Sequence, residues 1–197
     1  MQGVESGKTT LSTFHFPLAT MPWRDRLPAT PKIALVARHP ETRMQAPWDD
    51  PEWQIWICAP AGSTGHAPRW DAALEIHDYP WETEDFHRQW LRQQTKPVFV
   101  NRLRGECPGE LLFPRQELVD RFGSFFTSTV SWLLGLAISL ETTREIALYG
   151  VEMEAESEYA YQRPSALWLI GIAQGRGIKI TLPDSCRLMK APLYPPN

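Results

Sequence analysis

The chain has 197 residues, which suits one domain with extensions. Its 43% hydrophobic and 22% charged residues are ordinary for a globular protein and exclude wholesale disorder. A formal net charge of -3 provides no basic footprint for duplex nucleic acid, so the totals carry no strong nucleic-acid signal. The sequence has no apolar run of about 18 residues and no basic segment leading into an apolar one, so we expect neither a membrane span nor a signal peptide.

Cysteine and histidine usage limits the chemistry. Cys58, Cys107 and Cys186 have no C-x-x-C spacing, and their odd number argues against a secreted disulfide framework. We expect reduced thiols in a cytoplasm. The five histidines lack the spacing of metal ligands, so the sequence predicts neither a metal site nor a bound cofactor.

Proline is abundant, with 18 residues that gather partly at the two ends. This distribution predicts an extended N-terminal arm over residues 1–31 and a C-terminal tail over residues 183–197, on either side of a domain over residues 32–182. Arms of this kind either stay loose or pack on a neighbouring surface. They offer a route to homo-oligomers or to larger assemblies.

Short apolar runs and helical spacings alternate along the domain. The apolar runs predict strands over residues 32–37, 53–58, 72–77, 97–100, 144–153 and 178–182. The helical patterns predict helices over residues 81–94, with Phe86 and Trp90 facing inward, over residues 126–140, and from Pro164 to about residue 175. Residues 101–114, which include two glycines and two prolines, are expected to form a loop.

This order of elements predicts the fold class and the place of a site. Strands separated by helices favour a single Rossmann-like α/β domain, in which a mostly parallel sheet has helices on both faces. Ligands of such sheets bind beyond the carboxyl ends of the strands, near the reversal of strand order. We expect this edge to contain Arg38, His39, the loop after Cys58, the pair His77 and Asp78, and residues 150–153.

One motif near the N-terminus resembles a phosphate-binding loop. Residues 3–10 read GVESGKTT, which is one residue short of the G-x-x-x-x-G-K-[ST] spacing. No predicted strand precedes the motif, and Pro17 follows before a helix could form. We therefore interpret these residues as part of a flexible tail.

Two positions on the carboxyl edge could act on a ligand. Thr127, Ser128 and Thr129 begin the long helix, where hydroxyl groups either cap backbone N–H groups or help them to hold a phosphate or carboxylate. His77 stands beside the carboxylate of Asp78, so it could serve as an acid, a base or a ligand. A structural role at the end of a strand is the alternative for this histidine.

A third candidate lies in residues 156–164, ESEYAYQRP. Tyr159, Tyr161, Gln162 and Arg163 combine stacking, hydrogen bonding and a partner for an anion, which is a mixture typical of nucleotide and sugar pockets. The alternative is a packed polar loop.

Residues 126–153, together with the apolar run at 32–37 and the EYAYQRP segment, resemble a group of uncharacterised bacteriophage and prophage proteins. More distantly they resemble bacterial sialyltransferases and related glycosyltransferase-like proteins, in which a helix beginning Thr-Ser-Gly leads to a strand ending Gly-(Ile/Val)-Asp. The resemblance implies a Rossmann-like fold, a nucleotide-sugar ligand, and either the host cytoplasm or a virion as the location.

The sequence departs from that family at several expected site positions. The first strand leads into residues 37–41, ARHPE, where the sialyltransferases have a Gly-x-Gly-Pro-Ser loop over the donor. The second strand is followed by residues 58–60, CAP, where the family has an Asn. The aspartate of the later strand is Glu152 here, and the family's histidine-containing lid is not recognisable. The changes at residues 37–41 and 58–60 affect the positions that would hold the donor.

Three functions remain open. In the first, the protein binds a nucleotide or nucleotide sugar and transfers a group, with Arg38 and residues 127–129 on the phosphate and with His77 or Glu152 near the reacting centre. In the second, it binds a nucleotide without turnover. In the third, it is a phage structural or accessory protein that joins other copies or virion proteins through its arms. The EYAYQRP segment favours the first two.

Overall fold

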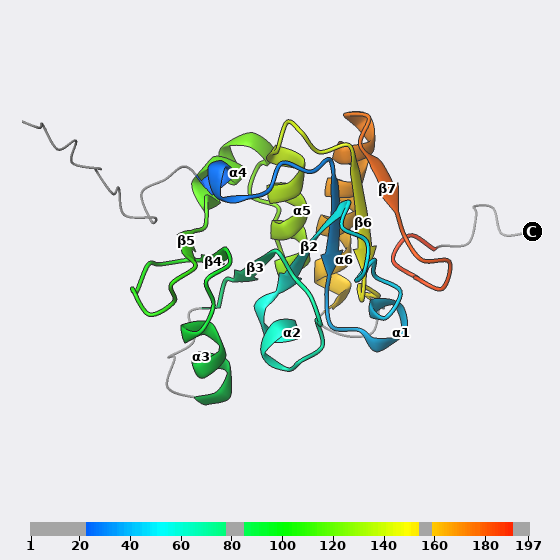
Figure 1. The fold of residues 1–197 in the computed structure, drawn as a ribbon. Coiled ribbons are helices and arrows are strands. Elements are labelled where there is room, and N and C mark those ends of the chain that lie inside the picture. Colours follow the sequence, from blue (N-terminus) through cyan, green and yellow to red (C-terminus); the bar gives the residue numbers. More distant parts are fainter. Residues whose placement is uncertain (1–22, 78–84, 154–158, 191–197) are drawn as a thin grey trace, which may run out of the picture.

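The computed structural model describes residues 23–77, 85–153 and 159–190 (Figure 1). Its strands are β1 (Lys32–Val36), β2 (Trp53–Cys58), β3 (Ala72–Glu75), β4 (Val98–Val100), β5 (Glu110–Leu112), β6 (Glu145–Tyr149) and β7 (Lys179–Thr181). Its helices are the 3-10 turn η2 (Trp23–Arg26), α1 (Pro40–Arg43), α2 (Ala59–Ser63), α3 (Asp85–Arg92), α4 (Arg115–Phe122), α5 (Thr129–Ser139) and α6 (Tyr159–Gly175).

The seven strands form one sheet in the order β5-β4-β3-β2-β1-β6-β7, and every neighbouring pair is parallel. The order runs outward from β1 to β5 on one side and then continues from β6 to β7 on the other side. The chain therefore reverses direction across the sheet between β1 and β6. This arrangement confirms the predicted Rossmann-like α/β domain.

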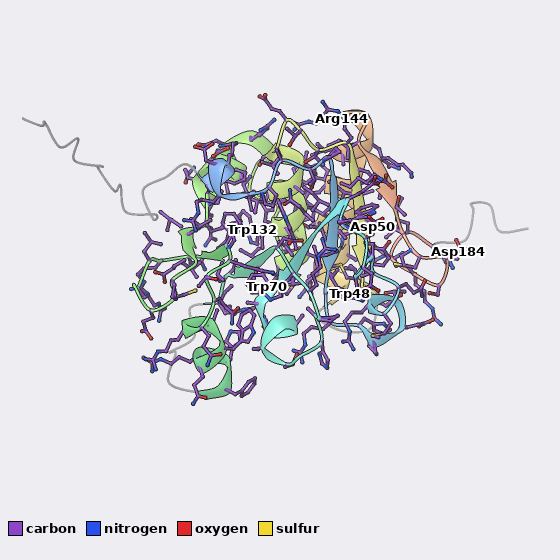
Figure 2. All side chains as sticks on the ribbon, viewed as in Figure 1. Trp48, Asp50, Trp70, Trp132, Arg144 and Asp184 are labelled. Carbon is purple, nitrogen blue, oxygen red and sulfur yellow. The ribbon has the colours of Figure 1, made fainter. Side chains whose placement is uncertain are left out.

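Both faces of the sheet are buried, as the continuous apolar runs of the strands require. Along β1, Ile33 and Leu35 enter one core cluster, whereas Ala34 and Val36 enter the other. Residues of α4, α5 and α6 fill the first cluster, and residues of α2 and α3 contribute to the second. Figure 2 labels Trp132 of the first cluster and Trp70 of the second.

The core extends beyond the expected domain limits in both directions. Trp23 and Leu27 are buried in the first cluster, although they belong to the predicted N-terminal arm. Cys186 and Leu188, in the predicted C-terminal tail, are buried in the same cluster. The packed unit thus includes residues on both sides of the range 32–182. In the described part of the chain, no helix combines the length and apolarity needed to cross a membrane.

Several local predictions were wrong. Phe86 was expected to face inward on α3 but is 53% exposed, because this helix enters the core through Leu91 and the partly buried Trp90. The expected loop over residues 101–114 contains β5, which pairs with β4. Helix α4 was not predicted. Helix α6 begins at Tyr159, and Pro164 lies inside it rather than at its first residue.

Candidate functional site

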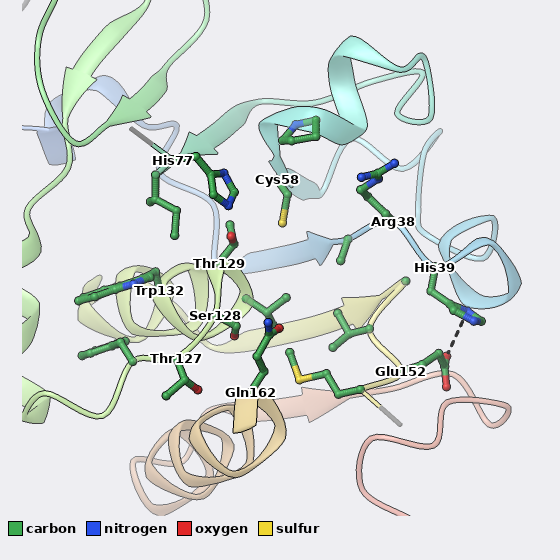
Figure 3. A pocket seen from close by; sticks show the side chains of 18 of the residues that line it. Arg38, His39, Cys58, His77, Thr127, Ser128, Thr129, Trp132, Glu152 and Gln162 are labelled. Carbon is green, nitrogen blue, oxygen red and sulfur yellow. Dashed lines mark ion pairs between the residues drawn. The ribbon is translucent and has the colours of Figure 1, made fainter. Parts of the chain in front are cut away.

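A pocket of about 1090 Å³ opens at the carboxyl ends of the strands (Figure 3). It lies where the strand order reverses, because its walls include the residues that follow β1 and those that follow β6. The N-terminal ends of α5 and α6 complete it. The lining residues are Ala37, Arg38, His39, Cys58, Pro60, His66, Ile76, His77, Phe126, Thr127, Ser128, Thr129, Val130, Trp132, Gly150, Val151, Glu152, Met153 and Gln162.

Backbone hydrogen bonds hold the two sides of the strand reversal together beyond the strands themselves. The N–H of Ala37 donates to the carbonyl of Tyr149 at 2.9 Å, and the N–H of His39 donates to that of Gly150 at 3.0 Å. Gly150 has a φ of 67°. The close approach of the segments that follow β1 and β6 brings Arg38 and His39 to one end of the pocket, as predicted.

The start of α5 is capped by its own side chains. The Ser128 hydroxyl accepts from the N–H of Ser131 at 3.0 Å, while the Ser131 hydroxyl accepts from the N–H of Ser128 at 3.0 Å. This capping box confirms that Ser128 serves as a cap. The N–H groups of Thr129 and Val130 belong to the first helical turn, which has no intrahelical acceptors, and both residues line the pocket. The capping box therefore occupies the N–H groups of Ser128 and Ser131 and does not use those of Thr129 and Val130.

The side chains at the start of α6 lie partly in the pocket and partly outside it. Gln162 points into the pocket from α6 (Figure 3). Tyr161 is 79% exposed and does not line it. The Arg163 guanidinium lies elsewhere, where Nε donates to the carbonyl of Leu188 at 2.9 Å and Nη2 to that of Lys190 at 3.0 Å. The structure therefore gives Arg163 a role in holding the C-terminal segment.

Glu152 lies in the pocket wall with both carboxylate oxygens engaged. Oε1 accepts from the Thr42 hydroxyl at 3.1 Å, and Oε2 accepts from the N–H of Arg187 at 2.9 Å. Thr42 in turn accepts from the N–H of Gly150 at 2.8 Å. Nδ1 of His39 lies 3.9 Å from Oε1 (Figure 3, dashed line). These contacts tie the end of β6 to α1 and to the segment after β7.

His77 has a carboxylate partner at Glu75, and its predicted partner Asp78 lies outside the described residues. Nδ1 of His77 is 3.0 Å from Oε1 of Glu75. This hydrogen bond raises the pKa of His77. Burial alone would raise the pKa of Glu75, but the hydrogen bonds from His77 and His87 outweigh it and lower that pKa to about 2. The carboxylate is therefore ionised, and the bond favours a charged imidazole.

Cys58 lines the pocket without being a reactive thiol. Burial, reinforced by the charge of Glu75, raises the pKa of Cys58 to about 12. Only the thiolate is a competent nucleophile, so at neutral pH this side chain acts as a small apolar group.

Met153 lines the pocket with a φ of 46°, in the left-handed region that side chains seldom adopt. Its side chain is only 5% exposed. Such a conformation costs on the order of 1 kcal/mol, so burial of the side chain has to offset it.

The structure brings most of the predicted site residues into one pocket. Those that line it are Arg38, His39, His77, Thr127, Ser128, Thr129, Glu152 and Gln162. Tyr161 and Arg163 do not line it. Tyr159 lies at the first residue of α6, but its side chain, like Asp78, is outside what the structure describes.

Glu75 and His87 were not predicted at all, and His66 was predicted only as part of the loop after Cys58. A carboxylate inside the apolar run of β3 was the available signal for Glu75, because a charge in such a run requires a partner. His87 offered no comparable signal.

No protein-family model, curated protein or solved structure matches this chain. The resemblance to glycosyltransferase-like proteins therefore stays a prediction. Within the described ranges, no group of three or more His, Cys, Asp or Glu side chains is arranged to hold a metal ion. The GVESGKTT motif lies outside those ranges.

Proposed function

We propose that the protein binds a nucleotide or a nucleotide sugar in the pocket between the ends of β1 and β6. The observation that carries the proposal is the set of basic and hydrogen-bonding side chains that line the pocket at the strand reversal. Its described lining contains the basic side chains Arg38, His39, His66 and His77, while its carboxylate, Glu152, is already hydrogen-bonded on both oxygens. Such a pocket suits an anion.

The helix start supports a phosphate in particular. The N–H groups of Thr129 and Val130 lie at the N-terminus of the 11-residue helix α5, where the helix dipole favours negative charge. The Thr127 hydroxyl donates to the carbonyl of Tyr161 at 2.9 Å, which couples this turn to the start of α6. Phosphate and the polar head of Gln162 would therefore meet on one side of the pocket.

The remaining walls suit an aromatic base. The rings of Phe126 and Trp132 stack with centroids 3.9 Å apart and planes 3° from parallel, and both residues line the pocket. Aromatic and apolar walls with a few placed polar groups are the usual make-up of small-molecule sites. A volume of about 1090 Å³ leaves space for a nucleotide with a sugar attached.

His77 suits the proton step of a group transfer. In a glycosyl transfer, the neutral form of His77 would accept the proton of the acceptor hydroxyl at Nε2, the hydroxyl oxygen would bond to the anomeric carbon, and the bond from that carbon to the phosphate oxygen would break. Glu152 is less suited to this step because both its oxygens hold structural hydrogen bonds. Assembly through the terminal arms remains the alternative function, and it rests on residues largely outside the described ranges.

A thermal-shift panel of nucleoside monophosphates, diphosphates and nucleotide sugars tests the proposal. A ligand at about 100 times its Kd adds about 2.7 kcal/mol, which raises the Tm of a chain of this size by roughly 5 °C or more. Gln162→Ala should weaken the shift, whereas Tyr161→Ala, one residue away but exposed, should preserve it. A panel in which no compound raises the Tm of the wild-type protein would refute the proposal.

A further inference from the structure

A chain of four polar side chains leads from the pocket into the space between β3, α2 and α3. Glu75 at the end of β3 is 4% exposed, and its Oε1 accepts from both the backbone N–H and Nδ1 of His77 at 3.0 Å. Its other oxygen, Oε2, lies 2.8 Å from Nε2 of His87. Nδ1 of His87 lies 2.7 Å from the hydroxyl of Ser63.

The hydrogen bonds determine which nitrogen of each ring carries the proton. Ionised Glu75 can only accept, so both ring nitrogens that contact it must be donors. Neutral His87 therefore carries its proton on Nε2, and its Nδ1 at 2.7 Å is a nearer acceptor for the Ser63 hydroxyl than the Pro60 carbonyl at 3.3 Å. Neutral His77 carries its proton on Nδ1, which leaves Nε2 as its unprotonated ring nitrogen. The two histidines are thus held in opposite tautomers.

The surrounding core fixes this chain in place. The His87 ring stacks on Trp90 with centroids 6.1 Å apart and planes 15° from parallel. A β-carbon on Gly62 would lie 2.4 Å from the Trp90 ring, so the glycine lets α2 approach α3 closely. The side chain of His87 is only 13% exposed. A buried carboxylate with two imidazoles is a costly way to fill a core, since apolar residues of similar volume are often as stable.

We propose that Glu75 and His87 are positioning residues that hold His77 in its Nδ1–H tautomer, so that neutral His77 presents Nε2 as its unprotonated nitrogen, and that Ser63 completes the chain. The inference rests on the proposed function for the role of His77. The tautomers themselves are independent of it. Carboxylates that orient a histidine in this way are a general device for making one ring nitrogen the acid or base.

Nitrogen-15 NMR of the histidine rings in the full chain, without ligand, tests the tautomers. At a pH where both rings are neutral, His77 should show a proton on Nδ1 and His87 a proton on Nε2. Glu75→Gln should lower the titration midpoint of His77 and mix its tautomers, whereas His66→Gln, elsewhere in the pocket lining, should change neither. A wild-type His77 that carries its proton on Nε2 would overturn the proposal.

A second variant keeps the proposal testable if the Glu75→Gln protein does not fold. Ser63→Ala removes only the terminal hydroxyl and should shift the Nδ1 resonance of His87 while leaving His77 on Nδ1–H. An unchanged His87 resonance would contradict the chain of four. If the tautomers are as stated and no nucleotide binds, the proposed function fails and the positioning of His77 stands. If a nucleotide binds and His77 carries its proton on Nε2, the proposed function stands and the positioning of His77 fails.

Discussion

A β-carbon placed on Gly150 would lie 2.5 Å from the carbonyl oxygen of Ala37, at the edge of the pocket where β1 and β6 end. The φ of Gly150 is 67°, so a substitution is strained by the backbone conformation as well as by the contact. This glycine therefore determines how closely the two sides of the strand reversal approach each other.

Gly150→Ala should lower the free energy of unfolding by about 2 kcal/mol or more, because a left-handed residue alone costs about 1 to 2 kcal/mol and the contact with Ala37 adds to it. Urea denaturation measures the change. Gly171→Ala is the matched control, because Gly171 is exposed in the middle of α6 and a β-carbon there meets nothing within 4 Å. That variant should gain about 1 kcal/mol. Equal effects of the two substitutions would contradict the role of Gly150.

Ser128→Ala should destabilise the protein by about 1 kcal/mol, because it removes the oxygen that accepts from the N–H of Ser131 at the start of α5. Thr129→Ala leaves the capping box intact and should change the free energy of unfolding by much less. Equilibrium unfolding in urea compares the two. A Ser128→Ala protein as stable as the wild type would show that the cap contributes nothing.

Glu75 should stabilise the protein in a pH-dependent way. Its pKa falls from an ordinary 4.5 to about 2 in the folded state, so its contribution is present above about pH 4.5 and is lost as the pH falls through about 2. The stability advantage of the wild type over Glu75→Gln should therefore shrink across this range. Urea denaturation of both proteins between pH 6 and pH 2 measures it, and an advantage that grew on acidification would have the wrong sign.

The three cysteines should be unreactive in the folded protein. All are buried, and burial raises the pKa of each thiol, that of Cys58 to about 12. A thiol reagent at pH 8 should modify the native chain slowly and label all three cysteines in denaturant. Rapid modification of Cys58 in the native protein would indicate an accessible thiolate in the pocket.

The amino-acid sequence predicted the frame and the place of the site for a simple reason. Apolar runs buried on both faces predict parallel strands, and parallel strands all end at the same edge. The ends of β1, β2, β3 and β6 therefore had to meet, which brought Arg38, His39, His77 and Glu152 into one pocket. These relationships follow from local pattern and topology alone.

What each side chain contacts was decided by the tertiary structure. Arg163 turned to the carbonyls of residues 187–190 because the C-terminal segment packs beside α6. Glu75 contacts His87 of α3 because the packing of α2 and α3 placed that ring beside the end of β3. Hydrogen bonds depend on distances of a few tenths of an ångström between residues far apart in the chain, and no local pattern specifies them. The sequence determined the edge of the sheet at which the pocket lies, and only the folded chain placed Glu75 beside both His77 and His87.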